Sequence, residues 1–146
     1  SAMNQHQQNK ASLLERLIFT LEGSLFGAIG TADAGGVLVY GLRGHLFRSA
    51  DFGDSWEEIP LKAASGDLEF GLSDGALLAD GRIVVVGHGG SVLESTDGGR
   101  SFSVFNRPDR LSLAGVSATG DGHLILVGQG GVHLAAANGA ALEQQQ

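Results

Sequence analysis

Short apolar runs recur along the chain and are separated by glycines and polar turns. The runs at residues 83–86 (Ile-Val-Val-Val) and 124–127 (Leu-Ile-Leu-Val) have the length of a buried strand and are far too short to span a membrane. Because every position in them is apolar, they predict strands that are covered on both faces. The 24 glycines are spaced between such runs, as many short strands joined by tight turns require.

The apolar runs belong to an internal repeat. Three segments align, at residues 39–49, 86–95 and 127–136. Each contains a glycine that ends a strand, and these glycines are 46 and 41 residues apart: Gly41, Gly87 and Gly128. A turn glycine stands six residues before each of them, twice within an Asp-Gly pair, which is a strong hairpin signal: Gly35, Gly81 and Gly122. Three further segments are predicted to open another strand in each unit: residues 24–27, 67–71 and 112–115.

Each unit is predicted to hold four short antiparallel strands. In the second unit these are expected at residues 68–78, 82–87, 91–95 and 101–105. A four-stranded unit of this length is typical of a β-propeller blade, whereas an immunoglobulin-like sandwich, the alternative, would alternate in most strands and lack the period. We therefore expect an all-β fold of about three propeller blades, the last incomplete, that form an incomplete ring.

The repeat divides the chain into blades and flanking segments. We expect a tag remnant and a flexible or helical leader, then a leading strand or helix, three blades of which the third lacks its outer strand, and a tail: residues 1–10, 11–23, 24–60, 67–106, 111–137 and 138–146. The second segment has two interpretations. Residues 17–21 are strand-like, while Ser12 and Glu15 could form the capping box of a short helix.

A turn motif of the form S-x-D-x-G-x-[ST]-[WF] follows the third strand of units one and two. Its Asp can accept hydrogen bonds from its own turn, its Gly can take a conformation closed to other residues, and its aromatic residue can fill the gap between two strands. The residues in these structural roles are Ser49, Asp51, Gly53 and Trp56, then Ser95, Asp97, Gly99 and Phe102. In unit three the matching positions hold Ala136, Asn138 and Ala140, so the motif has decayed.

The motif resembles the Asp-box, or BNR, repeat. The blade pattern, over about residues 17–134, is most similar to that of the photosystem II stability/assembly factor-like proteins. The resemblance implies a non-catalytic propeller that binds other proteins, and a periplasmic or otherwise exported location. It does not identify a client protein.

Charge and composition limit the kinds of partner and ligand that the chain is expected to bind. A net charge of −7 argues against nucleic acid and against an anionic membrane surface, and no segment could insert into a membrane. The absence of cysteine excludes disulfides and thiolate metal sites. None of the five histidines pairs with another at ligand spacing, so we expect neither a metal site nor a cofactor. Arg43, His45 and Arg48 form a small cationic group at one blade turn, which is a candidate binding site on the rim or an ordinary solvated surface.

We expect a non-enzymatic scaffold for protein interaction or assembly, without catalytic residues. A carbohydrate-binding or vestigial sialidase-like glycosidase propeller is the alternative. That chemistry needs clustered arginines with a Tyr nucleophile, or paired acids, whereas the one tyrosine, Tyr40, lies within an apolar strand. Three blades also leave open sheet edges. Either two chains close a six-bladed ring, each lending its N-terminal strand to a last blade, or the chain is a fragment of a longer propeller.

Overall fold

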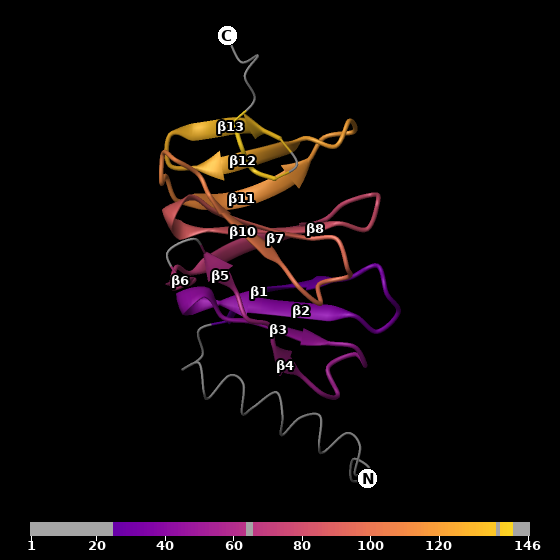
Figure 1. Ribbon diagram of the computed structural model, residues 1–146. Coiled ribbons are helices and arrows are strands. Elements are labelled where there is room, and N and C mark those ends of the chain that lie inside the picture. Colours follow the sequence, from indigo (N-terminus) through magenta and orange to yellow (C-terminus); the bar gives the residue numbers. More distant parts are fainter. Residues whose placement is uncertain (1–24, 64–65, 137, 142–146) are drawn as a thin grey trace.

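Three antiparallel sheets lie side by side in the computed structural model, which describes residues 25–63, 66–136 and 138–141 (Figure 1). The predicted leader at residues 1–10 and the leading strand or helix at residues 11–23 lie outside the described residues, as does most of the tail. Within the described residues the chain is all-β, and its helical turns are two short 3-10 turns. The all-β prediction is confirmed.

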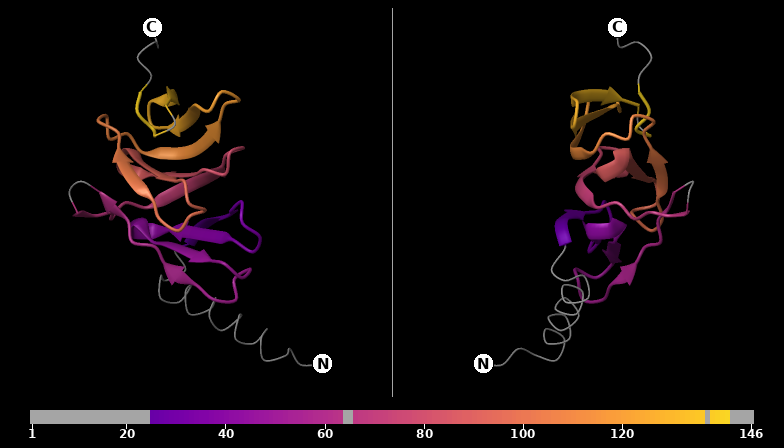
Figure 2. Two further views of the ribbon diagram at one scale, coloured as in Figure 1. Left: turned by 45° about the vertical axis from the view of Figure 1, so that its right-hand side comes forward. Right: turned by 90° about the vertical axis from the view of Figure 1, so that its left-hand side faces the viewer.

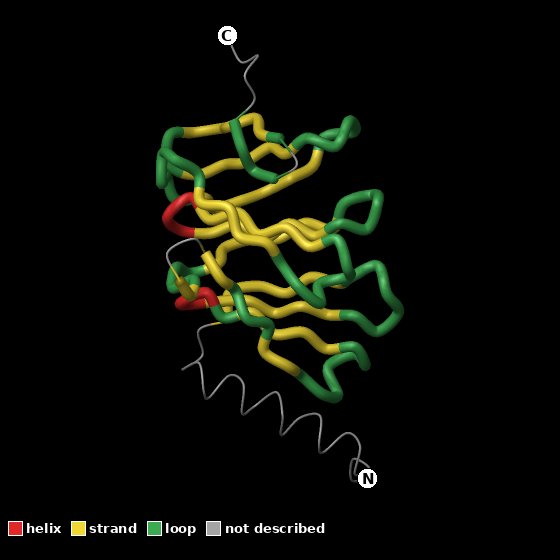
Figure 3. Tube along the Cα trace, in the orientation of Figure 1, coloured by secondary structure: helices red, strands yellow, loops and turns green. Residues whose placement is uncertain are grey.

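Each sheet is a meander in which consecutive strands are neighbours. Blade 1 consists of β1 (Leu25–Gly30), β2 (Val37–Gly41), the 3-10 turn η1 (Leu42–Gly44), β3 (Leu46–Ser49) and β4 (Glu57–Glu58). Blade 2 consists of β7 (Leu72–Leu77), β8 (Ile83–Gly87), η2 (His88–Gly90), β9 (Ser91–Ser95) and β10 (Ser103–Asn106). Blade 3 consists of β11 (Leu113–Ala118), β12 (Leu124–Gly128) and β13 (Gly131–Ala135). The 3-10 turns lie along one edge of the stack, the glycine-turn edge, and the first hairpins lie along the opposite hairpin edge (Figure 3).

The pairing registers show which positions are equivalent in the three blades. The first strand of each blade begins with a leucine opposite the glycine that ends the second strand, and its register shifts just after: Leu25 with Gly41, Leu72 with Gly87, and Leu113 with Gly128. The prediction that residues 67–71 open the first strand of blade 2 is therefore wrong, because that strand begins at Leu72. Gly71 follows a phenylalanine as Gly27 does, and this local likeness misaligned the two segments.

A small hairpin is inserted between blades 1 and 2. It consists of β5 (Lys62–Ala63) and β6 (Gly66–Asp67), which pair with each other and with no other strand of the described chain. The insertion accounts for the longer first repeat spacing. It was not predicted, since two-residue strands leave no periodic signal.

The core lies between the sheets. Alternate side chains of β8 point to opposite neighbours: Ile83 and Val85 join the cluster between blades 1 and 2, and Val84 and Val86 join the cluster between blades 2 and 3. All four are fully buried. The all-apolar run at residues 83–86 is thus a strand with a blade on each side, as the sequence predicted. The same prediction for residues 124–127 is wrong for one face, because no described blade follows blade 3 and Val127 is 38% exposed.

The stack forms an open arc, and no ring is closed by the described residues (Figure 2). Its two outermost sheet faces differ. On blade 1, Val39 and Phe47 of the outer face are buried. On blade 3, Val132 of the outer face is 73% exposed and Leu134 is 39% exposed.

Candidate binding site

Two turns of the same sequence type follow β3 and β9 at the hairpin edge, and we call them turn A (residues 49–56) and turn B (residues 95–102). In turn A the Ser49 hydroxyl donates to Asp51 Oδ1 (2.7 Å) and accepts from the N–H of Gly53 (2.7 Å). The Asp51 carboxylate also accepts from the N–H (2.8 Å) and the hydroxyl (2.7 Å) of Ser55. The side chains of turn A therefore satisfy one another and the backbone that they enclose.

Turn B repeats these contacts. The Ser95 hydroxyl donates to Asp97 Oδ1 (2.7 Å) and accepts from the N–H of Gly99 (2.9 Å), and the N–H of Ser101 donates to Asp97 Oδ1 (3.0 Å). Gly99 has a φ of +86°, in the left-handed region that favours glycine. The two turns are thus one local device used twice.

The hydrogen bonds of both turns stabilise ionised carboxylates. They hold the pKa of Asp51 at about 2, where the Ser55 hydroxyl makes the largest contribution, and the pKa of Asp97 at about 2, where the Ser101 hydroxyl does so. Glycoside hydrolysis needs a carboxylic acid whose pKa is raised, so that it can donate a proton. The pKa values of Asp51 and Asp97 are lowered instead, so these carboxylates are not suited to donate that proton.

The aromatic residues complete the turns. The Trp56 indole N–H donates to the carbonyl of Gly53 (3.0 Å), and its ring packs against the Val39 and Phe47 cluster. Phe102 packs against the core between blades 1 and 2. The aromatic residue of each turn therefore connects the turn to an apolar cluster of the blades.

The third copy of the motif forms a different turn. The N–H of Ala136 donates to the carbonyl of Ala140 (2.8 Å), and Asn138 Oδ1 accepts from the N–H of Ala140 (3.0 Å). Ala141 then forms an isolated antiparallel bridge with Ala135. Asn138 thus stands at the position of the motif Asp but accepts from the N–H two residues further on, whereas Asp51 and Asp97 accept from the N–H four residues further on. Among the residues that the structure describes, the bridge of Ala141 lies at the place of the fourth strand of blades 1 and 2.

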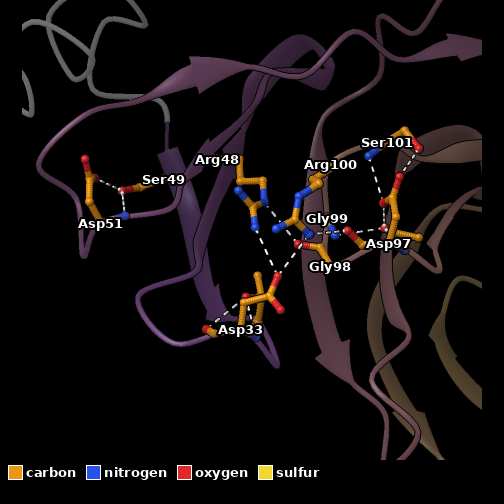
Figure 4. A network of polar contacts seen from close by, with 11 residues as sticks. Asp33, Arg48, Ser49, Asp51, Asp97, Gly98, Gly99, Arg100 and Ser101 are labelled. Atoms are coloured by element: carbon orange, nitrogen blue, oxygen red, sulfur yellow. Dashed lines mark hydrogen bonds and ion pairs between the residues drawn. The ribbon is translucent and has the colours of Figure 1, made fainter.

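Arg48 lies between blades 1 and 2 rather than on the rim. The residue is 5% exposed, and its guanidinium donates from Nε to the carbonyl of Gly98 in turn B (3.0 Å). Asp33, from the first hairpin of blade 1, accepts from Arg48 (3.4 Å) and from Arg100 (3.0 Å). Figure 4 shows Asp33 between the two guanidinium groups. Arg48 therefore joins two blades and is separated from Arg43 and His45, with which the sequence grouped it.

Arg43 and His45 do lie together, beside a cavity of about 530 Å³ at the glycine-turn edge of blade 1. We call this the rim cavity. It is lined by η1 and the start of β3, by the chain from β4 to β5, and by one residue ahead of blade 2: Arg43, Gly44, His45, Glu58, Ile59, Pro60, Leu61, Lys62 and Leu68. Ile59, Leu61 and Leu68 are buried and form its apolar part. The inserted hairpin therefore helps to build this cavity.

The polar side of the rim cavity is organised by one close pair. His45 Nδ1 lies 2.7 Å from Glu58 Oε2, and the imidazole stacks on Phe47 with ring centroids 6.3 Å apart. Arg43 is exposed and has a φ of 60°, a conformation that non-glycine residues rarely adopt. A guanidinium, an imidazole and a carboxylate thus surround an apolar hollow. Such a mixture can fix an apolar side chain and hydrogen-bond the polar groups beside it.

The sequence did not single out Glu58 or the apolar wall. Glu58 lies thirteen residues beyond His45, and strand pairing between β3 and β4 brings the two together. The wall comes from the insertion and the segment around it. The available signal was a polar residue, Glu58, in a short predicted fourth strand. Its contact with His45 could be predicted only if the register between the third and fourth strands were known.

Tyr40 and Asp74 meet near the inner strands. Tyr40 is 3% exposed, and burial, followed by the charge of Asp74, raises its pKa, while a hydrogen bond from the backbone of Gly75 lowers it. Asp74 Oδ2 accepts from the N–H of Val116 in blade 3 (3.0 Å). The tyrosine therefore links blade 1 to blade 2, and the carboxylate links blade 2 to blade 3.

The described part of the chain contains no group of three or more His, Asp or Glu side chains placed to hold a metal ion. Its helical segments are too short and too polar to cross a membrane.

Stacked antiparallel meanders of three or four strands, with β7 in contact with β1 on one side and with β11 on the other, define the fold as that of β-propeller blades. Comparison with solved structures supports this class. The chain is similar to YCF48 bound to D1 peptide, with a TM-score of 0.64 and 18% identity over 79% of this chain and 37% of that one. It is also similar to YCF48 from Cyanidioschyzon merolae, with a TM-score of 0.64 and 24% identity over 80% of this chain and 38% of that one.

At these identities the similarity shows the fold, and the chain spans a little over a third of the length of the YCF48 chains that it matches. No protein-family model matches the sequence, and no curated protein matches it.

Proposed function

We propose that this chain is a non-enzymatic protein-interaction module, of the assembly-scaffold type, that holds a peptide segment of a client protein in the rim cavity. The rim cavity is the observation that carries the proposal. It combines a hollow of about 530 Å³ with an apolar wall and an exposed guanidinium at one position. Binding sites of this kind take their affinity from the apolar contact and their orientation from a few polar groups.

The lining residues indicate what the peptide would look like. Ile59, Leu61 and Leu68 can receive an apolar side chain, while Arg43 can pair with a carboxylate beside it. His45 and Glu58 already satisfy each other, so they can offer their remaining lone pair and N–H to a peptide backbone. The favoured ligand is a peptide in which an apolar residue neighbours an acidic one.

The comparisons support a peptide as the class of ligand. A YCF48 chain, which shares the fold, has been solved bound to a D1 peptide. From this comparison we take only the class of ligand, a peptide, and not the sequence of the D1 peptide. An assembly role would follow if the bound peptide belongs to a subunit of a larger complex.

Turns A and B support membership in the Asp-box propellers, which we also propose. Both carry the S-x-D-x-G-x-[ST]-[WF] pattern, and both close it with the same serine-to-aspartate contact of 2.7 Å. Because these carboxylates are bound within their turns, the motif contributes to folding rather than to a site.

The environment of Tyr40 supports a non-enzymatic role. A sialidase-like mechanism would need a tyrosine hydroxyl that reaches the substrate with help from a carboxylate. Tyr40 is 3% exposed, its hydroxyl is bonded to the backbone of Gly75, and its pKa is raised rather than lowered. A nucleophile must be accessible and activated, and Tyr40 is neither.

A display selection tests the proposal. Random short peptides are selected on the immobilised full chain, and the enriched peptides are synthesised with a fluorophore and titrated by fluorescence polarisation. We expect enrichment of peptides with an apolar–acidic pair and a loss of about tenfold in affinity for Arg43→Ala.

Arg110→Ala is the matched control, because Arg110 is also an exposed arginine with a positive φ (55°) and does not line the cavity. Its affinity should equal that of the wild type. A selection that enriches no peptide, or peptides that bind Arg43→Ala as tightly as the wild type, would refute the rim cavity as the site.

A further inference from the structure

Each blade has a back face, by which we mean the side chains of its second and third strands that point toward the position of the following blade. The registers make these positions equivalent. In blade 1 they are Leu38, Tyr40, Leu46 and Arg48; in blade 2 they are Val84, Val86, Val92 and Glu94; in blade 3 they are Ile125, Val127, Val132 and Leu134. Blade 3 thus has four apolar residues at positions where each of the other blades includes one charged residue.

The back faces of blades 1 and 2 are covered by the following blade. Leu38 and Leu46 are fully buried, as are Val84 and Val86. The same positions are open in blade 3, where Val127 is 38%, Val132 is 73% and Leu134 is 39% exposed. Within the described ranges, the structure therefore shows the same surface in a buried form in blades 1 and 2 and in an exposed form in blade 3.

The opposite end of the arc is not available in the same way. The outward face of blade 1 carries Val39, at 9% exposure, and Phe47, at 7%, with Val37 and Trp56 packed against them. Of the two terminal sheet faces in the described chain, the back face of blade 3 is the one that exposes its apolar residues. An assembly with one such face per chain closes after two copies, whereas a ring or a filament needs two complementary faces.

We propose that the back face of blade 3 packs against the same face of a second copy, so that two chains form a symmetric dimer through their third blades. The contact would be one sheet face on another, with branched aliphatic side chains interdigitating as they do between blades 2 and 3. This arrangement differs from a six-bladed ring, in which blade 3 of each copy would meet blade 1 of the other.

The chemistry of the face suits a copy of itself. A chain with a net charge of −7 repels its copies wherever acidic groups face each other. The four residues of this face carry no charge, and leucine stands at the position that Glu94 occupies in blade 2. A two-fold axis through the face therefore brings together apolar groups only.

Sedimentation velocity and light scattering of the full chain test the state of assembly. We expect a species of twice the 15.0 kDa chain mass that dissociates on dilution. Val132→Glu places a carboxylate at the centre of the contact and should give the monomer. Leu77→Glu is the matched control, since Leu77 is also exposed (42%) but lies on β7, and it should leave the dimer intact.

Cross-linking separates the symmetric dimer from the ring. The chain has no cysteine, so single cysteines can be introduced at Val127 and Val132 and treated with a short bis-maleimide. In the symmetric dimer at least one of these variants becomes linked to its own copy, while Thr96→Cys, an exposed residue of turn B, does not.

In a ring the two third blades would lie on opposite sides and neither variant would be linked. A monomer at all concentrations up to about 100 µM, or a dimer that neither variant cross-links and that Trp56→Glu disrupts, would overturn the proposal. The first result would favour a fragment of a longer propeller, and the second would favour the ring.

Discussion

Ser49 and Asp51 show how a single pair of side chains can define a turn. The hydroxyl of Ser49 uses its donor on Asp51 and its lone pairs on the N–H groups of Asp51 (3.2 Å) and Gly53 (2.7 Å). The donated hydrogen bond works best when the aspartate is ionised, so the turn and the charge depend on each other. The same dependence holds for Ser95 and Asp97 in turn B.

This dependence predicts a loss of stability in acid. The folded state holds the pKa of Asp51 and Asp97 at about 2, below their ordinary value of 3.8. As the pH falls from about 4 toward 2, the unfolded chain binds protons that the folded chain does not, so the free energy of unfolding decreases. Above about pH 4 both states are ionised at these positions and the contribution is complete. Thermal unfolding followed by circular dichroism from about pH 6 to about pH 2 should show this decline in the lower half of the range.

The Asp51→Asn and Asp97→Asn double variant provides the control. Asparagine keeps an acceptor oxygen in the side chain, but it does not titrate. The variant should be less stable than the wild type near neutral pH and should lose less stability in acid. If the two proteins decline in parallel, the acid sensitivity comes from other groups.

At the scale of the elements, each junction between blades combines an apolar interior with a few polar links. Blades 1 and 2 are joined by Tyr40 through Gly75 and by Arg48 through turn B. Blades 2 and 3 are joined by Asp74 through Val116, and Arg107, which is 5% exposed, donates to the carbonyl of Gly139 (2.6 Å). These links fix how one sheet is placed on the next, which apolar packing alone does not specify.

Arg48→Ala is expected to weaken the first junction. It removes a buried guanidinium and leaves the carbonyl of Gly98 without that donor, and a hydrogen bond to a charged group is worth about 1.5–3 kcal/mol. We expect a loss of about 2–3 kcal/mol in the free energy of unfolding, measured by urea denaturation.

Arg100→Ala is the control for this prediction. Arg100 pairs with the same carboxylate, Asp33, but its side chain is 58% exposed, so its removal should cost less than about 1 kcal/mol. Equal losses for the two variants would contradict the distinction between a buried link and a surface ion pair.

Much of this architecture could be predicted from the repeat, and the predictions that were wrong failed for physical reasons. The run at residues 83–86 indicated its strand because burial on both faces leaves an all-apolar signature. The run at residues 124–127 has the same signature and is also a strand, but only one of its faces is covered by a described blade, and Val127 is 38% exposed. The start of β7 was misplaced because Phe70-Gly71 imitates Phe26-Gly27, and only pairing with Gly87 identifies Leu72 as the first residue. Local sequence likeness does not encode register, which depends on the partner strand.

The candidate site was predicted in part for a similar reason. Arg43, His45 and Arg48 are close in sequence, but side chains of a strand alternate between its two faces. Arg48 therefore points into the junction with blade 2, while Arg43 and His45 lie at the opposite end of β3 beside the rim cavity. The cavity wall could not be foreseen, since it is built from an insertion that interrupts the repeat.

At the scale of the whole molecule, the arc separates its two proposed surfaces. The rim cavity is lined by residues of blade 1 and of the inserted segment, and the open back face belongs to blade 3. Blades 1 and 3 lie at opposite ends of the stack (Figure 1). A dimer formed through blade 3 would leave both rim cavities accessible. Two linked cavities would also raise the apparent affinity for a client that presents two copies of its peptide.

The central claim, that the chain is a peptide-binding module whose site is the rim cavity, is tested most directly by amide chemical-shift mapping. A peptide selected on the chain is titrated into the isotope-labelled protein while its backbone amides are observed. The account predicts that the large shift changes gather at residues 43–45, 58–62 and 68, and that Arg43→Ala reduces them while Arg110→Ala does not. Shift changes centred on turns A and B or on the back face of blade 3, with the rim cavity unaffected, would contradict it.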